Sequence, residues 1–336
     1  MRILVKGAGV AGLTTAHELA RRGAEVLVVE KYPSVGGEAS WLAGGMLAPF
    51  CERESGEEAV IALGQGSADW WQAALPGLVT FNGTLVVAPP RDTAELRRFA
   101  ARTRGYSNLS ADEIAALEPD LAGRFRAGLF FADEAHLDPR HALDRLHAKL
   151  ATMGVRFLFG RTEAPGHERF EQVVDCTGIA ARQVLPDLRG VRGEMFYLET
   201  REVSLARPVR LIHPRFPVYV VPRGGGRFMV GATMIESADG GPVTARSLME
   251  LLNAAYALHP AFGEARVVEV AAGVRPAFPD NLPKIVERDG AIFINGFFRH
   301  GFLMAPAFAR QAADFIFADH PRKDEPDETC RQRATA

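Results

Sequence analysis

The first thirty residues carry the clearest pattern of hydrophobic and polar positions in the chain. A short apolar run at residues 2–6 ends in glycines, an amphipathic stretch covers residues 10–22, and residues 24–30 are again mostly apolar. The two apolar runs predict strands, and the stretch between them predicts a helix that ends before Gly23. Because near-continuous apolar strands are typical of a parallel sheet covered on both faces, we expect a βαβ unit here.

The rest of the chain alternates between helical and strand periods. We expect helices at residues 57–75, 92–104, 110–117, 137–153, 247–258 and 304–318. Residues 79–88 predict a hairpin that turns at Asn82–Gly83. Residues 193–235 predict an all-β stretch, and its last two strands turn at Gly224–Gly226. Further strands are expected at residues 155–159, 173–175, 265–275 and 291–294.

Composition narrows the class of protein without defining it. With 336 residues, 47% of them hydrophobic, the chain can build a sizeable core. Its net charge of -2 gives no overall basic field for nucleic acid or a membrane, and Arg299 and His300 interrupt the apolar stretch at residues 291–308. Three widely spaced cysteines indicate neither a disulfide framework nor a metal site. We therefore expect a cytoplasmic protein that binds no nucleic acid, membrane or metal.

A glycine motif joins the first strand to the first helix. Gly7, Gly9 and Gly12 form a G-x-G-x-x-G pattern, and Glu30 ends the next strand. Such glycines permit a tight turn and let a pyrophosphate bind at the N-terminus of the helix, while the acidic residue accepts hydrogen bonds from the ribose. A carboxylate at position 30 would also repel the additional phosphate of NADP. The motif in this context predicts a dinucleotide site.

Two later segments favour FAD over NAD as that dinucleotide. Residues Asp175–Gly178 run from a strand end into a glycine turn and resemble the corresponding segment of flavoproteins. Residues Ile294–Gly301 lead into the last predicted helix and resemble the segment that brings a helix N-terminus to the pyrimidine side of the flavin. A dehydrogenase that uses NAD needs neither segment.

With these residues in place, the chain resembles the glycine oxidases of thiamine (thiazole) biosynthesis, within the D-amino-acid oxidase and sarcosine oxidase family. The resemblance covers about residues 1–318. The segments that carry it are Gly7–Gly12 with Glu30, Ser40–Leu47, Tyr219–Arg223, Val230–Met234, Ala272–Pro276 and Phe298–Ala307.

The resemblance implies roles for three side chains at the substrate. Arg275 would bind the substrate carboxylate through two parallel hydrogen bonds, Tyr219 would add another, and Arg299 would hold the substrate or the polar edge of the flavin. From the residues alone, other interpretations stay open: Arg275 could pair with a structural acid such as Asp280, Tyr219 could only pack, and Arg299 could make a structural contact.

The resemblance also implies a set of FAD contacts. FAD should be bound without a covalent link, because Gly273 stands where sarcosine oxidases carry a flavin-bonded cysteine. Phe216 and Pro217 stand where one member has a histidine, so contacts at the mouth of the pocket should differ. The predicted FAD-binding residues are Gly7, Gly9, Val10, Ala11, Gly12, Glu30, Lys31, Ala39, Ser40, Gly44, Gly45, Met46, Thr177, Gly178, Phe298, Arg299, His300, Gly301, Phe302 and Leu303.

The expected fold is mixed α/β (α+β overall), in which a Rossmann-like FAD-binding domain is interleaved with an antiparallel-sheet substrate domain. We assign residues 1–54, 132–188 and 271–320 to the FAD-binding domain. Residues 55–131 and 189–270 are assigned to the substrate-binding domain. Residues 321–336 are polar and predict a loose C-terminal tail.

The reaction implied is oxidation of a small amino acid by hydride transfer to flavin N5. It would give an imine, then a keto acid and ammonia, with O2 reduced to hydrogen peroxide. The substrate would be glycine, in support of thiamine thiazole biosynthesis, or else sarcosine, a D-amino acid or a bulkier N-carboxymethyl amine. An NAD-linked dehydrogenase and an electron-transfer flavoprotein are the alternatives of other classes, and a homo-oligomer is left open.

Overall fold

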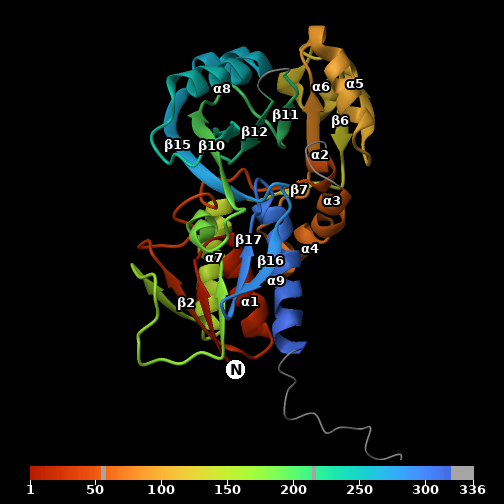
Figure 1. Cartoon of the computed structure of the whole chain (residues 1–336). Helices are drawn as coiled ribbons and strands as arrows, with labels where there is room; N and C mark the ends of the chain where they lie inside the picture. The colour runs from red at the N-terminus through yellow and green to blue at the C-terminus, as the bar shows by residue number, and fades with distance from the viewer. Residues whose placement is uncertain (54–57, 214–216, 319–336) are drawn as a thin grey trace, which may run out of the picture.

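The computed structural model describes residues 1–53, 58–213 and 217–318, and these form two parts built on separate sheets (Figure 1). The predicted loose tail at residues 321–336 lies outside the described residues. No helix among the described residues is long and apolar enough to cross a membrane.

The lower part in Figure 1 is a six-stranded sheet with helices packed on it. Its strand order is β16-β17-β9-β1-β2-β8, and every neighbouring pair is parallel except β16 and β17. The strands are β1 (Arg2–Lys6), β2 (Glu25–Glu30), β8 (Arg156–Phe159), β9 (Gln172–Asp175), β16 (Lys284–Arg288) and β17 (Ala291–Asn295). The helices are α1 (Val10–Arg21), α3 (Glu58–Gly64), α4 (Ser67–Ala74), α7 (Pro139–Thr152) and α9 (Gly301–Ala318).

The upper part is a nine-stranded, largely antiparallel sheet in the order β14-β10-β13-β12-β11-β4-β6-β5, with β15 paired to β10. Its strands are β4 (Thr84–Val87), β5 (Ser107–Ser110), β6 (Ala127–Phe131), β10 (Arg189–Glu199), β11 (Val209–Leu211), β12 (Val218–Pro222), β13 (Arg227–Gly231), β14 (Ile235–Glu236) and β15 (Arg266–Ala277). Its helices are α5 (Thr93–Ala101), α6 (Ala111–Leu117) and α8 (Ala245–Leu258).

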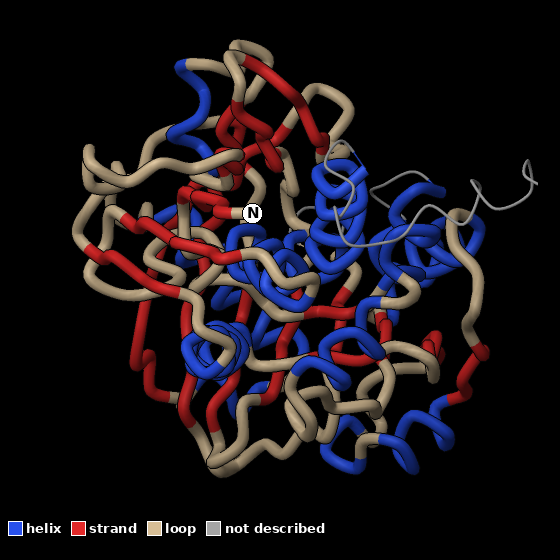
Figure 2. The backbone as a smooth tube through the Cα atoms, turned by 90° about the horizontal axis from the view of Figure 1, so that it is seen from below, coloured by secondary structure: helices blue, strands red, loops and turns tan. Residues whose placement is uncertain are grey.

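Short elements join the two parts. The strand pair β3 (Met46–Leu47) and β7 (Ala135–His136) and the helix α2 (Pro49–Glu52) lie between them (Figure 1). Figure 2 shows the same backbone from below, with helices and strands in separate colours. The structure also has the 3-10 turns η2 (Pro90–Asp92), η3 (Pro119–Leu121), η4 (Gly178–Gln183) and η5 (Pro260–Gly263).

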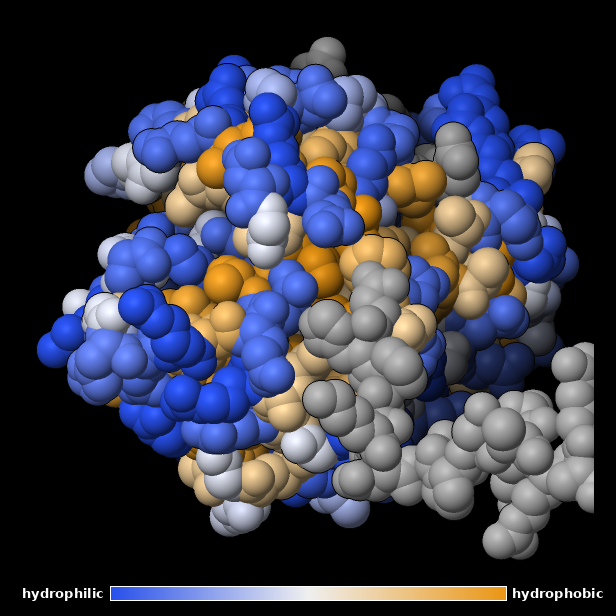
Figure 3. Space-filling model, turned by 60° about the horizontal axis from the view of Figure 1, so that its bottom comes forward, coloured by the Kyte–Doolittle hydropathy of each residue, from blue (hydrophilic) through white to orange (hydrophobic). Residues whose placement is uncertain are grey.

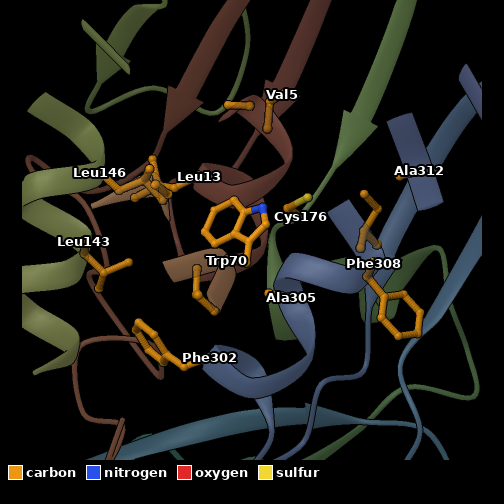
Figure 4. Close-up of a cluster of buried hydrophobic side chains, with 14 of the residues drawn as sticks. Val5, Leu13, Trp70, Leu143, Leu146, Cys176, Phe302, Ala305, Phe308 and Ala312 are labelled. Atoms are coloured by element: carbon orange, nitrogen blue, oxygen red, sulfur yellow. The ribbon is translucent and has the colours of Figure 1, made fainter. Parts of the chain in front are cut away.

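The core of the lower part forms where α1, α4, α7 and α9 meet the parallel sheet. Figure 4 shows Trp70 in the middle of this cluster, with Leu13 on one side and Cys176 on the other. Its indole nitrogen donates a 2.8 Å hydrogen bond to Glu18 on α1, so the ring packs without leaving its polar atom unsatisfied. Apolar burial of this kind is the main force that holds helices on a sheet.

The face of the molecule shown in Figure 3 is predominantly polar. On the face shown in Figure 3, apolar side chains lie mostly in hollows between polar ones. Single exposed apolar side chains are normal on a folded protein.

The expected hairpin at residues 79–88 is wrong. Only β4 forms there, and its neighbours are β6, which is antiparallel, and β11, which is parallel. All four residues of β4 are buried, so the strand needs a neighbour on each side, and both come from distant parts of the sequence. Gly83 makes a turn at φ +75°, but the chain before it does not fold back as a strand.

The domain boundaries remain a prediction, and the structure adds detail to them. Helices α3 and α4, which we assigned to the substrate-binding domain, pack against α9 of the lower part. Strand β15 begins in the upper sheet and runs past the boundary placed at residue 271. One strand therefore passes between the two proposed domains.

Candidate active site

A single cavity runs from the glycine turn after β1 to the end of the upper sheet. Of the predicted site residues, Gly12 alone does not line it. The residues brought together along its wall are Gly7, Gly9, Val10, Ala11, Glu30, Lys31, Ala39, Ser40, Gly44, Gly45, Met46, Thr177, Gly178, Tyr219, Arg275, Phe298, Arg299, His300, Gly301, Phe302 and Leu303.

The glycine turn is packed too closely for side chains. Gly7 has φ +95°, and a Cβ there would strike the carbonyl oxygen of Cys176. A Cβ on Gly12 would overlap the carbonyl oxygen of Gly7, so Gly12 brings the helix close to the turn without reaching the cavity. Helix α1 begins at Val10 with no acidic residue in its first turn. Its N-terminus therefore favours an anion such as a pyrophosphate.

The acid at the end of β2 is held in place by backbone donors. Glu30 is buried, and its carboxylate accepts hydrogen bonds from the backbone N–H of Ala8 at 2.6 Å and of Tyr32 at 3.0 Å. The neighbouring Lys31 ammonium lies 2.8 Å from the Glu38 carboxylate. The contact between Glu30 and a ribose stays a prediction, supported by its position on the cavity wall.

The two flavin segments predicted from the sequence meet beside the glycine turn, because β9 pairs with β1 and Gly301 packs against Val10. Asp175 Oδ1 accepts hydrogen bonds from the backbone and hydroxyl of Thr177, and Asn295 Nδ2 donates to the Gly178 carbonyl at 2.9 Å. Phe298 adopts φ +51°, and its N–H donates to Pro276 on β15 at 2.9 Å. This fixes the bend before α9, so that the N-terminus of that helix also lies at the cavity.

Arg275 extends from β15 into the part of the cavity next to the upper sheet. Its Nη1 donates to the Thr233 carbonyl at 3.1 Å. Among the described residues no carboxylate lies within ion-pair distance of it, and Asp280, the structural partner considered from the sequence, lies 3.0 Å from Lys284. Burial and the nearby Arg299 lower the pKa of Arg275 to about 10. The guanidinium is therefore still charged at neutral pH and available to an anion.

The sequence analysis missed Glu52, which ends α2 and lines the same cavity. It is buried, and Arg299 Nε lies 2.8 Å from its Oε2. Burial raises the pKa of this carboxyl, but the positive charges of Arg299 and Arg210 and the hydrogen bond from Tyr219 outweigh burial and lower it to about 2. Glu52 is thus a carboxylate at neutral pH.

Tyr219 and Arg299 both contact Glu52. The Tyr219 hydroxyl donates to Glu52 Oε1 at 2.8 Å and accepts from Arg210 at 3.2 Å, and burial raises the pKa of Tyr219 well above its usual value. Arg299 also donates to Glu52 Oε1, at 3.2 Å. The expected hydrogen bond from Tyr219 to a substrate stays a prediction, because in this structure the hydroxyl donates to Glu52.

Burial also keeps His300 uncharged. The ring is buried near Glu52, and burial together with the arginines lowers the pKa of His300 to about 4.

Pro217, which directly precedes β12, belongs to the described chain, whereas Phe216 lies outside the described residues. The predicted difference at the mouth of the pocket therefore stays a prediction.

Arg223 belongs to a segment that carries the family resemblance, but the sequence analysis predicted no role for it. It directly follows β12, where the β12–β13 hairpin begins to turn. Its guanidinium donates to the carbonyls of Leu137 at 3.0 Å and Gly44 at 2.6 Å. Gly44, Gly45 and Met46 form a short segment that lines the cavity. Arg223 thus attaches this segment to the upper sheet.

Comparison with known proteins agrees with this geometry. Residues 2–315 match the family model described as FAD dependent oxidoreductase. The chain is 62% identical over 313 residues to the "Putative thiamine biosynthesis oxidoreductase ThiO" of Rhizobium etli, covering 93% of this chain and 95% of that one. It is 28% identical to the glycine oxidase of Pseudomonas aeruginosa, over 95% and 96% of the two chains.

The fold has a close counterpart among solved structures. The glycine oxidase from Geobacillus kaustophilus superposes with a TM-score of 0.80 at 24% identity, covering 94% of this chain and 95% of that one. The chain therefore belongs to the family of FAD-dependent oxidoreductases. The predicted family, fold class and FAD cofactor are confirmed, and the NAD-linked alternative is set aside.

Proposed function

We propose that this protein oxidises glycine to iminoacetate, which water converts to glyoxylate and ammonia, while O2 is reduced to hydrogen peroxide. The observation that carries the proposal is Arg275, a charged guanidinium at the cavity with no carboxylate partner among the described residues. The names of the relatives in Rhizobium etli and Pseudomonas aeruginosa support the substrate and a role in thiamine biosynthesis. A cytoplasmic location fits that role.

The residues present fit FAD along the cavity. The glycine turn leaves room for the dinucleotide backbone, and two helix N-termini, those of α1 and α9, lie on the cavity wall. The backbone around Gly44–Met46 and Thr177–Gly178 would contact the flavin end. FAD, when bound, supplies the acceptor for the substrate hydride and the route by which the electron pair reaches O2.

The chain itself contributes binding and orientation. Arg275 holds the substrate carboxylate by a charge-assisted pair of hydrogen bonds, and this fixes the substrate Cα relative to the cavity. Glu52 and Arg299 neutralise each other at 2.8 Å, so they leave the charge of Arg275 uncompensated. Hydride transfer depends mainly on such orientation and needs no strong general base.

A peroxide-coupled assay of the FAD-loaded protein tests the proposal. The substrates are glycine, sarcosine, D-alanine and D-proline, with ammonia and glyoxylate measured in parallel. Glycine should give one peroxide and one glyoxylate per turnover. Peroxide from D-alanine or D-proline alone would move the assignment to a D-amino-acid oxidase, and no peroxide from any of the four would contradict it.

A further inference from the structure

In the part of the chain that the structure describes, three charged side chains line the end of the cavity next to the upper sheet. They are Arg275, Arg299 and Glu52. Arg299 and Glu52 form two contacts, at 2.8 and 3.2 Å, whereas Arg275 makes its hydrogen bond to a backbone carbonyl. The three charges therefore sum to a single positive charge at this end.

Among the described residues, the other ionisable groups near Glu52 add no further charge to the cavity wall. The pKa of His300 is about 4, so its ring is neutral at neutral pH. Tyr219 stays protonated, and its hydroxyl donates a hydrogen bond to Glu52. Arg210 reaches the Tyr219 hydroxyl and the Cys51 carbonyl from behind the wall and is not among the cavity-lining residues. Glu134 lies behind Cys51, away from the lining.

A substrate with one carboxylate matches a single uncompensated guanidinium. A second carboxylate on the same substrate would need a second cation. Arg299, the other cation that the described residues place at this end, is already paired with Glu52. The second carboxylate would also meet the negative charge of Glu52. Repulsion of this kind is an effective way to reject a wrong ligand.

We infer that Glu52 is the specificity-determining residue that restricts this site to substrates carrying a single carboxylate, because it occupies Arg299 and opposes a second anion. The inference rests on the proposed function for the location of the substrate. It separates glycine and sarcosine, which carry one carboxylate, from iminodiacetate, which carries two.

Binding of anions without an amine tests the inference apart from turnover. Acetate and malonate differ by one carboxylate, and each is titrated into the FAD-loaded protein while the visible flavin spectrum is followed. The wild type should bind acetate more tightly than malonate. In Glu52→Gln the ratio of the malonate Kd to the acetate Kd should fall by at least about tenfold, because a dianion gains more than a monoanion from the added positive charge.

Two further variants complete the design. Glu199→Gln removes an exposed carboxylate from the far end of β10 and should leave the ratio unchanged. Arg299→Met keeps the charge of Glu52 and removes its partner, so Glu52 can turn to Arg275. Both anions should then bind more weakly, malonate by the larger factor. This variant still tests the inference if Glu52→Gln does not fold.

Steady-state turnover of the same variants provides a second test of the inference. The ratio of kcat/KM for iminodiacetate to that for sarcosine should rise in Glu52→Gln. An unchanged malonate-to-acetate ratio in both variants would overturn the inference. So would a Glu52→Gln protein that loses affinity for sarcosine while keeping it for acetate, because Glu52 would then bind the substrate amine. Absence of any turnover by the wild type would instead count against the proposed function, and the anion titrations would still decide the inference.

Discussion

At position 193 a glycine faces the guanidinium of Arg275. Gly193 lies on β10, directly beside β15, and a Cβ built on it would overlap the Arg275 guanidinium. A methyl group there would push the guanidinium aside without removing its charge. Because the end of an arginine side chain is flexible, the fold itself should tolerate the change.

We therefore predict that Gly193→Ala raises the KM for glycine by at least about tenfold, because a displaced Arg275 guanidinium loses its two parallel hydrogen bonds to the substrate carboxylate. Steady-state kinetics measure the effect, and FAD content should stay at the wild-type level. Gly240→Ala is the matched control, since a Cβ at position 240 would meet open space. Equal KM values in the two variants would contradict the position assigned to Arg275.

A second residue-scale prediction concerns Glu134, which is buried behind the site. Its carboxyl accepts a 2.7 Å hydrogen bond from the Cys51 N–H, and burial raises the pKa of Glu134 from 4.5 to about 7. Between these two pH values the native protein binds a proton that the unfolded chain has released. Raising the pH through this window therefore destabilises the native state.

Glu134→Gln removes this titration, because the amide stays neutral at all these pH values. The stability of the variant relative to wild type should increase by about 2–4 kcal/mol between about pH 4.5 and about pH 7, and then level off. Denaturant unfolding of both FAD-loaded proteins across this range measures it. A stability difference that does not depend on pH would show that Glu134 is ionised throughout.

The site also shows which residues a sequence can reveal. Gly7, Glu30 and Arg275 belong to local motifs whose chemistry depends on near neighbours, and all three line the cavity. Glu52 has no such signal: its partners Tyr219 and Arg299 are 167 and 247 residues away. A single acid of this kind gains its meaning from tertiary packing alone.

At the scale of elements, the β12–β13 hairpin holds the segment at residues 44–46, which lines the cavity. Arg223 donates from the hairpin to the carbonyls of Gly44 and Leu137. Removal of the guanidinium leaves both carbonyls without their charged donor, and buried acceptors without a partner are costly. The segment at residues 44–46 should then lose its fixed position beside the cofactor.

We predict that Arg223→Met weakens FAD binding by at least about tenfold, because two charge-assisted hydrogen bonds are lost. Titration of the apoprotein with FAD, followed by protein fluorescence, gives the Kd. Arg227→Met on the same hairpin, where the arginine is exposed and pairs with Glu199, should bind FAD as the wild type does. If both variants bind FAD equally well, Arg223 does not position the segment.

The elements themselves were predictable where their pattern was local. Helix α7 lies within the expected residues 137–153, and the turn at Gly224–Gly226 joins β12 and β13 as expected. Strand β4 was misassigned because its two neighbours come from residues 127–131 and 209–211. Strand β11 is only three residues long and carries too short a pattern to be recognised.

At the scale of the whole molecule, the cavity joins residues from both sheets. Its wall includes Gly7 and Glu30 from the lower part and Tyr219 and Arg275 from the upper part. Bound FAD would therefore contact both parts and stabilise them together, as any ligand specific for the native state does. The interleaved order of the two sheets along the chain was predictable, but their relative placement depends on long-range packing.

The cofactor should be released by denaturation. Gly273 lines the cavity where a flavin-bonded cysteine would stand by resemblance, and burial raises the pKa of the Cys176 thiol, which keeps it unreactive. Acid precipitation of the purified protein should leave a colourless pellet and a yellow supernatant that absorbs near about 450 nm. Yellow colour retained in the washed pellet would indicate a covalent link.

The central claim is that Arg275 binds a carboxylate inside the FAD-containing cavity, and a titration with acetate tests it most directly. Acetate should perturb the visible spectrum of the FAD-loaded wild type in a saturable manner. Arg275→Met should keep its FAD and raise the acetate Kd by at least about 30-fold, because a charge-assisted bidentate pair is lost. An Arg275→Met protein that binds acetate as tightly as the wild type would contradict the account.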